Sequence, residues 1–370
     1  MQIREIYHHQ LQAYIDSEEY KRANYIAISK HRALSHLKNP RAKADDLVLV
    51  LIYEGGEMVA YLGVFADDLH FTTGIEHVGW LSCMWVNPIM RGKGIAKKLI
   101  HTVFEAWSYK ILVTEFTPAA EGLYNRTGQF IDLAKPRGLR GYLRLNLAYL
   151  LPKKDPKWNK WAPLLSCIDG LFNLPNALRL QLKAASFLKL KGINFEYLSE
   201  LDDETWAFIQ KNKLPELMNR DRKDLTWLTR NPWLISSKLT DYNASRYHFS
   251  ATDSSFNFLN VKIYNSNLEV IGFLILSIRG KNMKVPYAYV QEGAADKVLQ
   301  VIYKHLIALK LDMLTVFHPV LVKQIAKGKA PFFLTRNFQR HYIIGKVLED
   351  QLVATPNFVI QDGDADAAFT

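Results

Sequence analysis

The sequence predicts an α/β protein built from two mixed-sheet domains in tandem. Its 370 residues exceed the usual length of a single domain. Runs rich in β-forming residues alternate with amphipathic helical stretches, which is typical of helices packed on a mixed sheet. The order of these segments in the first 150 residues recurs after residue 190. We therefore expect one domain over residues 1–150, a connector over 151–190 and a second domain over 191–370.

The first part of the chain predicts helices followed by three strands. One or two helices are expected between residues 10 and 37, and the loop "NPRAKADD" follows them. The stretch "LVLVLIYEGGEMVAYLGVFADDL" reads as two strands joined at Gly55-Gly56, because glycine accepts the positive φ angles of a tight hairpin. A third strand, "HVGWLSCMWV", ends at Asn87-Pro88.

An amphipathic helix is predicted from about Ile95, with Leu99 and Val103 on the same face. It leads into a fourth strand, "ILVTEF", and then into a short helix around residues 121–126. A strand near "YLRLNLAYL" is expected to complete the first sheet.

Two short matches suggest that the second half repeats the first. "VTEFTP" at 113–118 is echoed by "LTVFHP" at 314–319, and Ile52-Tyr53 is echoed by Ile263-Tyr264. An amphipathic helix precedes both members of the first pair. Chance similarity of short β-rich segments is the alternative, but the shared order favours duplication.

The net charge of +11 is unevenly spread, since residues 151–190 carry seven basic and two acidic side chains. In this connector Lys153, Lys154, Lys157 and Lys160 alternate with Trp158 and Trp161. Such a mixture occurs in proteins that stack on nucleic acid or lie on a membrane surface, and tryptophans that pin a linker onto two domains explain it equally well. Because the charge is not concentrated as in a nucleic-acid footprint, we expect no nucleic-acid partner.

The rest of the composition indicates a cytoplasmic protein. Its two cysteines, Cys83 and Cys167, are far apart, which favours a reducing compartment. We see no secretory signal and no apolar run of transmembrane length. No zinc-type spacing of His and Cys is present, so no metal site is predicted, and the G-x-S-x-G elbow of a serine hydrolase is absent.

The loop "RGKGIA", residues 91–96, is the strongest chemical signal in the sequence. The P-loop pattern is absent, and Gly92-x-Gly94 is followed by Lys97, which is too bulky for a dinucleotide fingerprint. A third pattern, R/Q-x-x-G-x-G/A, is satisfied by Arg91, Gly94 and Ala96. Free N–H groups at a helix start bind phosphate, and small residues let the phosphate reach the backbone.

With a strand before this loop and a helix and strand after it, the chain over Val78–Phe130 resembles the GNAT superfamily of acetyl-CoA-dependent N-acetyltransferases. The resemblance implies that the loop amides hold the coenzyme A pyrophosphate and that the end of the preceding strand binds the pantetheine and acetyl carbonyl. It assigns the first role to Arg91, Gly92, Lys93, Gly94, Ile95 and Ala96, and the second to Met84, Trp85 and Val86. Tyr124 matches the tyrosine that protonates the departing thiolate. The family often reads Y-x-x-x-G-F, whereas here Gln129 separates Gly128 from Phe130.

Acyl transfer also needs a base, because an amine with a pKa of about 10.4 is mostly protonated at neutral pH. Glu76, His77 and Glu115 are candidates on or near the central strands, and each has an ordinary structural explanation as well. We favour Glu115, which lies on the strand opposite the expected pantetheine slot.

The second domain is expected to be a degenerate copy. Alignment of the repeats puts Glu292-Gly293-Ala294-Ala295-Asp296 opposite the phosphate loop and Ile325 opposite Tyr124. Acidic side chains at a helix start repel phosphate, so we predict that this copy does not bind coenzyme A. It would instead shape the acceptor site or a homodimer interface. The acidic stretch "QDGDADAAFT" at 361–370 could face the substrate, but an ordinary frayed terminus is the stronger interpretation.

The sequence thus predicts an N-acyltransferase that moves an acetyl group from acetyl-CoA to a primary amine. Two alternatives remain open: a non-catalytic module that senses acyl-CoA or binds a partner, and an aminoacyl-tRNA-dependent transferase.

Overall fold

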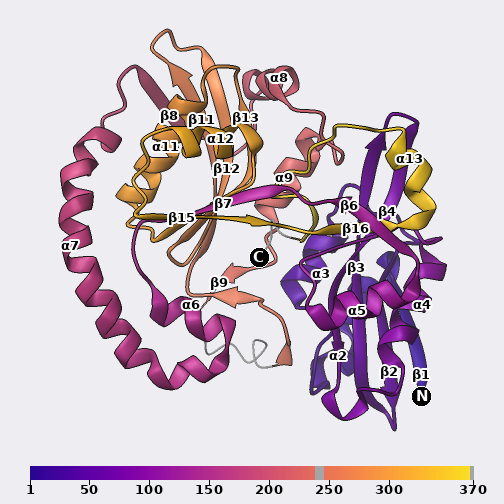
Figure 1. The fold of residues 1–370 in the computed structure, drawn as a ribbon. Coiled ribbons are helices and arrows are strands. Elements are labelled where there is room, and N and C mark those ends of the chain that lie inside the picture. The colour runs from indigo at the N-terminus through magenta and orange to yellow at the C-terminus, as the bar shows by residue number, and fades with distance from the viewer. Residues whose placement is uncertain (238–245, 367–370) are drawn as a thin grey trace. The chain divides into compact units, whose positions relative to one another are not determined.

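A computed structural model of the chain describes residues 1–237 and 246–366, apart from the side chains of Lys153 and of residues 183–186. The chain forms two compact units that interleave along the sequence (Figure 1). The first comprises residues 1–136, 214–257 and 339–370, and the second comprises residues 137–213 and 258–338. These units differ from the contiguous division at residues 150 and 190 that the sequence suggested.

The first unit contains a seven-stranded sheet in the order β1-β2-β3-β4-β5-β16-β6. Its strands are β1 (Gln2–Tyr7), β2 (Leu47–Glu54), β3 (Glu57–Phe71), β4 (Gly74–Val86), β5 (Ile111–Thr114), β6 (Phe130–Ala134) and β16 (Tyr342–Gly345). Gly55 and Gly56 join β2 to β3 with φ angles of 61° and 83°, which confirms the predicted hairpin. β1, a polar edge strand, was not predicted.

The apolar run of β2 is buried on both sides of this sheet. Val50 and Ile52 pack with Leu99 of helix α4 (Ile95–Ala106), whereas Leu49 and Leu51 belong to the core beneath the N-terminal helices. Those helices are α1 (Leu11–Asp16), α2 (Glu18–Arg22) and α3 (Lys30–Leu37), with α5 (Pro118–Thr127), α9 (Arg222–Arg230) and α13 (Glu349–Val353) elsewhere in the unit. Because successive strand residues point to opposite faces, a strand covered on both faces loses its polar alternation.

The second unit contains a seven-stranded sheet in the order β15-β7-β14-β13-β12-β11-β8. Its strands are β7 (Arg137–Tyr142), β8 (Ile193–Tyr197), β11 (Phe256–Asn265), β12 (Val270–Arg279), β13 (Asn282–Val290), β14 (Met313–Val316) and β15 (Leu334–Gln339). Its helices include α6 (Leu147–Lys154), α7 (Ala162–Leu188), α8 (Asp203–Asn212), α11 (Ala295–Ala308) and α12 (Pro319–Lys327).

The two sheets have matching strand orders, which supports the predicted duplication. Read from β8, the second sheet follows the order of the first sheet read from β1, with β11 in the place of β2 and β14 in the place of β5. In each sheet the sixth strand comes from the other half of the sequence: β16 lies between β5 and β6, and β7 lies between β14 and β15. The halves have therefore exchanged equivalent strands.

This exchange corrects the prediction of a strand near "YLRLNLAYL" in the first sheet. The strand ends at Tyr142, pairs with β14 of the second sheet, and is followed by helix α6. Residues 145–151 contain no β-branched residue and are rich in leucine, which favours helix over strand.

Candidate functional site

Strands β4 and β5 separate after a short parallel pairing. They pair at Gly79 with Ile111 and at Trp80 with Leu112, and β5 then continues beside β16 instead. The register between β3 and β4 shifts over the next residues of β4, where Cys83 adopts a φ of 62°. Such a bulge re-aims the strand and interrupts its ladder. The separation leaves a gap beside Met84, Trp85 and Val86, the backbone that the sequence assigned to the pantetheine.

The predicted phosphate loop opens helix α4. Gly92 and Gly94 have φ angles of 81° and 75°, a conformation that side chains with a Cβ rarely adopt. No side-chain hydrogen bond caps this helix and no acidic residue lies in its first turn. Its first N–H groups are thus free of an internal partner and carry the positive end of the helix dipole.

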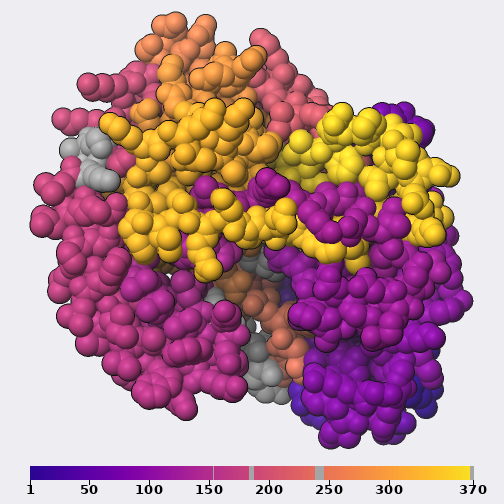
Figure 2. Space-filling view, viewed as in Figure 1, coloured from indigo at the N-terminus to yellow at the C-terminus, as the bar shows by residue number. Residues whose placement is uncertain are grey.

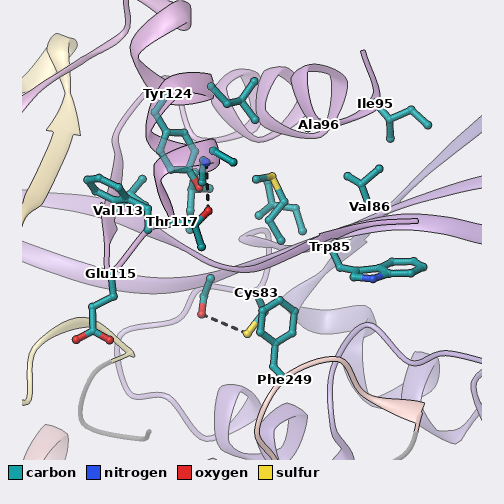
Figure 3. A pocket seen from close by; sticks show the side chains of 18 of the residues that line it. Cys83, Trp85, Val86, Ile95, Ala96, Val113, Glu115, Thr117, Tyr124 and Phe249 are labelled. Carbon is teal, nitrogen blue, oxygen red and sulfur yellow. Dashed lines mark hydrogen bonds between the residues drawn. The ribbon is translucent and has the colours of Figure 1, made fainter. Parts of the chain in front are cut away.

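A cavity of about 830 Å³ joins these two features (Figure 3). Most of the residues predicted to bind the cofactor line it, together with both predicted catalytic residues. They are Met84, Trp85, Val86, Arg91, Gly92, Gly94, Ile95, Ala96, Glu115 and Tyr124. Lys93 does not line the cavity; its amine contacts the Met90 sulfur at 3.4 Å.

Tyr124 lies on helix α5 with its ring nearly buried, at 4% exposure. Phe116 and Phe130 contact the ring edge-on and fix its position. Burial, and after it the negative charge of Asp366, raise the pKa of Tyr124 above its ordinary value. The phenol therefore keeps its proton at neutral pH, as a proton donor must.

Glu115 lines the same cavity but is held by an ion pair. Its carboxylate lies 2.8 Å from Nε of Arg340, and its backbone has a φ of 52°. In Figure 3 its side chain extends away from Tyr124. A carboxylate that neutralises a guanidinium is less available as a base.

The other two base candidates, Glu76 and His77, lie outside the cavity lining. The Glu76 carboxylate accepts a hydrogen bond from Lys110 at 2.7 Å. His77 bridges two carboxylates, with Nδ1 2.8 Å from Asp68 and Nε2 2.9 Å from Asp46. Both side chains have structural partners, as the ordinary interpretation of each anticipated.

The His77 bridge predicts a pH-dependent stability. Burial lowers the pKa of His77, but hydrogen bonds to Asp46 and Asp68 outweigh it and raise the pKa to about 9, against a smaller opposing effect of Lys43. A raised folded-state pKa stabilises the protein below the unfolded value of about 6.5, and this contribution disappears as the pH rises through about 9. We expect His77→Gln to lower the free energy of unfolding by about 1 to 2 kcal/mol at pH 6, since solvent screens this partly exposed side chain, and by much less at pH 10. Urea unfolding at several pH values checks this, and a pH-independent difference would contradict it.

Among the cavity residues that sequence reasoning missed, Arg32, Ser82 and Asp366 form a connected polar group. Arg32 Nη2 donates to Ser82 Oγ at 2.9 Å, and Ser82 Oγ donates to Asp366 Oδ2 at 2.6 Å. The Arg32 guanidinium lies 4.0 Å from the centre of the Trp233 ring. Burial raises the pKa of Asp366, and the negative charge of Glu115 raises it further. The hydrogen bond from Ser82 and the positive charges of Arg32 and Arg340 lower this pKa by a smaller amount.

Asp366 reaches the cavity because residues 361–366 are packed into the first unit. Arg220 bonds Asp67 at 2.6 Å and Asp364 at 3.3 Å, and Arg340 bonds Asp362 at 2.6 Å. Residues Gln361 to Ala365 are all buried. The prediction that the acidic stretch frays is therefore wrong for these residues, while 367–370 lie outside the described part. The weaker interpretation of the tail, that it faces the substrate, agrees with the place of Asp366 on the cavity wall. The sequence could not show which arginines would hold the tail, since Arg220 and Arg340 are not its neighbours along the chain.

The arrangement combines the predicted phosphate loop, a protonated phenol and the half-buried carboxylate of Asp366 around one cavity. Among the described residues, no group of His, Cys, Asp and Glu is arranged to hold a metal ion. These groups suit the transfer of an acyl group from a donor that carries phosphate.

Comparison with known proteins agrees with this geometry. Residues 3–128 match the family model of the acetyltransferase (GNAT) family. This part of the chain is a GNAT domain. A search of curated protein sequences gives no match.

Solved structures extend the likeness beyond the matched GNAT residues. A probable N-acyltransferase of unknown function from Enterococcus faecalis is 9% identical, with a TM-score of 0.50 over 93% of this chain and 71% of that one. Saccharomyces cerevisiae N-myristoyltransferase with bound myristoyl-CoA is 11% identical, with a TM-score of 0.49 over 93% and 82%. A tandem GNAT protein from the clavulanic acid biosynthesis pathway is 12% identical, with a TM-score of 0.47 over 93% and 98%. At such identities the likeness concerns the fold alone.

The second unit has a mixed seven-stranded sheet with the same strand order as the GNAT domain, but it differs from that domain at the corresponding positions. Gly293 keeps a positive φ of 79°, like Gly92. Ala294, which the repeat aligns with exposed Lys93, belongs instead to the hydrophobic core. Ile325 is buried like its counterpart Tyr124 but has no hydroxyl group. That this unit does not bind coenzyme A remains a prediction.

Proposed function

We propose that the GNAT domain transfers an acetyl group from acetyl-CoA to a primary amine. The observation that supports this is the single cavity that runs from the uncapped start of α4 to the gap between β4 and β5, with Tyr124 on its wall. A pyrophosphate fits the first end, because the glycines leave the backbone open and no acidic side chain lies in the first turn of the helix.

On the donor side, the backbone N–H groups at the start of α4 bind the pyrophosphate, whereas those of Arg91 and Lys93 donate to Pro88 and Met90 within the loop. Arg91 and Lys97 line this end and add positive charge. The backbone of Met84 to Val86 orients the pantetheine arm and the acetyl carbonyl. Tyr124 donates its proton to the sulfur as the C–S bond breaks.

On the acceptor side, Asp366 takes the proton that the ammonium group must lose before its nitrogen can attack. Of the two carboxylates that line the cavity, Glu115 is paired with a guanidinium at 2.8 Å, whereas Asp366 accepts a hydrogen bond from neutral Ser82. The raised pKa of Asp366 makes its carboxylate the better proton acceptor. As the C–N bond forms, the second amine proton returns to the Tyr124 oxygen, and Asp366 later releases its proton to solvent.

Charge reversal in the loop tests the donor half of this proposal. Arg91 and Lys98 are both exposed, but only Arg91 lines the cavity. We expect Arg91→Glu to weaken acetyl-CoA binding about tenfold, because it places a negative charge beside the pyrophosphate. Lys98→Glu makes the same change of charge nearby, in the first turn of α4, and should alter Kd by less than about threefold. Titration calorimetry measures both.

Equal effects of the two substitutions would contradict the loop assignment, and no measurable affinity of the wild type for acetyl-CoA would remove the proposed function. Release of free thiol in the presence of a panel of primary amines then separates the enzyme from an acyl-CoA sensor. Binding without turnover on any amine would favour the sensor, and transfer that requires charged tRNA would favour the aminoacyl-tRNA-dependent alternative.

A further inference from the structure

Helix α7 of the second unit has its polar side turned inward. Asp169 accepts hydrogen bonds from the N–H groups of Leu147 and Ala148 at 2.8 and 2.9 Å. Asn173 and Asn176 bind the backbone of residues 143–145, at distances of 2.7 to 2.9 Å. The spacing of three and four residues places these polar side chains on one face. They fix the helix to the unit through hydrogen bonds to backbone groups.

The opposite face of α7 is apolar, and within the described part of the chain it is exposed. Its exposed aliphatic residues recur every three or four positions and are Leu164 (52% exposed), Ile168 (40%), Leu171 (67%), Leu174 (72%), Leu178 (59%) and Leu182 (76%). None of the exposed residues from Ala162 to Leu182 is charged. In Figure 2 the surface of this helix, in magenta, lies at the edge of the view without another described segment over it.

A stripe of this kind is unusual on a protein surface. From Leu164 to Leu182 it extends over about 27 Å of helix, and contiguous exposed apolar surface of such length marks an interaction site. An ordinary surface helix has the reverse arrangement, with its apolar side turned to the core. We therefore expect a binding partner or a membrane to cover these leucines.

The residues just before α7 indicate which kind of surface covers the leucines. Trp158 and Trp161, 40% and 47% exposed, lie in the short turn just before the helix. Lys154, Lys157 and Lys160 are exposed beside them, and the 151–190 segment has seven basic and two acidic residues. Exposed tryptophan and lysine next to an uncharged leucine face match the interface of a bilayer with anionic lipid, where the rings lie at headgroup level and the lysines meet lipid phosphate.

We propose that α7 docks the protein on the surface of an anionic membrane, with its leucine face in the boundary between headgroups and acyl chains. No helix in the described residues has the length and apolar character needed to cross a bilayer, so α7 lies along the surface. This goes beyond the proposed acyl transfer, since α7 lies outside the GNAT domain and lines no part of its cavity.

Vesicle flotation with the full chain tests the proposal. We expect the wild type to float with vesicles of one part phosphatidylglycerol to three parts phosphatidylcholine, and at least about tenfold less with phosphatidylcholine alone or in high salt. The double variant Leu171→Glu/Leu178→Glu should lose at least about tenfold in bound fraction. The control Leu268→Glu/Val353→Glu makes the same change at residues that are 68% and 76% exposed elsewhere, and should bind like the wild type.

Light scattering measures the oligomeric state of each variant in solution, and a thermal melt measures its stability. All four positions are exposed, so both variants should melt with the wild type. Failure of the wild type to bind the anionic vesicles, or an equal loss in both variants, would overturn the proposal. A wild-type dimer that Leu171→Glu/Leu178→Glu converts to a monomer would overturn it too, because a second copy would then be what covers the face.

Discussion

Replacing Tyr124 with phenylalanine should lower kcat for acetyl transfer by about two orders of magnitude and leave the Kd for acetyl-CoA almost unchanged. The substitution removes only the phenolic oxygen and keeps the ring that Phe116 and Phe130 hold edge-on. Because Tyr124 is 4% exposed, a smaller residue would add a packing defect to the chemical one. Phenylalanine avoids this confusion, so a loss of rate can be assigned to the missing proton donor.

The measurement is thiol release at saturating acetyl-CoA, with titration calorimetry for affinity. Tyr124 lies on α5, away from the loop that would bind the pyrophosphate, so binding and chemistry should separate. A raised donor pKa keeps the phenol protonated across the neutral range. The loss in the variant should therefore be similar from pH 6 to 8. Unchanged turnover would exclude Tyr124 from the mechanism, and an equal loss of affinity and rate would make its role one of packing.

Asp366→Asn should lower kcat/KM by about two to three orders of magnitude, whereas Glu115→Gln should lower it by less than about tenfold. The two substitutions form a matched pair, since each exchanges a carboxylate on the same cavity for an amide of nearly the same shape. Asparagine can still accept the hydrogen bond that Ser82 donates at 2.6 Å. Glu115 is expected to contribute mainly through its pairing with Arg340.

The pH dependence of kcat/KM separates a catalytic role of Asp366 from a structural one, because losing a structural contact would not change the shape of the profile. A base works when deprotonated, so kcat/KM should rise with pH through the pKa of Asp366, which burial holds above the ordinary aspartate value. The groups acting on this carboxylate are Ser82, Glu115, Arg32 and Arg340. In Asp366→Asn this rise of kcat/KM at low pH should be absent. The proposal would be contradicted if Glu115→Gln lost more kcat/KM than Asp366→Asn and if Asp366→Asn still showed the rise at low pH. Glu115 would then be the base.

Local sequence was sufficient to predict those features that depend only on residues close together along the chain. The glycine pair at 55–56 predicted a hairpin because tight turns need positive φ, and Gly92 and Gly94 adopt the same conformation at the start of α4. Ile95, Leu99 and Val103 predicted the buried face of that helix, and all three belong to the core of the first unit. Within the first unit, most of the predicted cofactor residues then meet at one cavity.

Other features depend on partners that are remote in sequence. Glu115 was favoured as the base because it lies near the slot, but Arg340, which holds it, comes 225 positions later in the chain. The acidic stretch at 361–366 looked like a frayed end, yet Arg220 and Arg340 bury its aspartates and bring Asp366 to the cavity. Tertiary contact also decided that the strand after residue 136 joins the second sheet.

The hairpin at Gly55-Gly56, the positive-φ glycines before α4 and the short helix that carries Tyr124 were predicted from the sequence alone, because turn geometry and helix periodicity act over a few residues. The exchange of strands β7 and β16, the arginine that holds Glu115 and the entry of Asp366 into the cavity were decided only in the folded chain. Pairing between strands and neutralisation of a buried charge join residues through space, and no local pattern specifies which distant partner a strand edge or a carboxylate will meet.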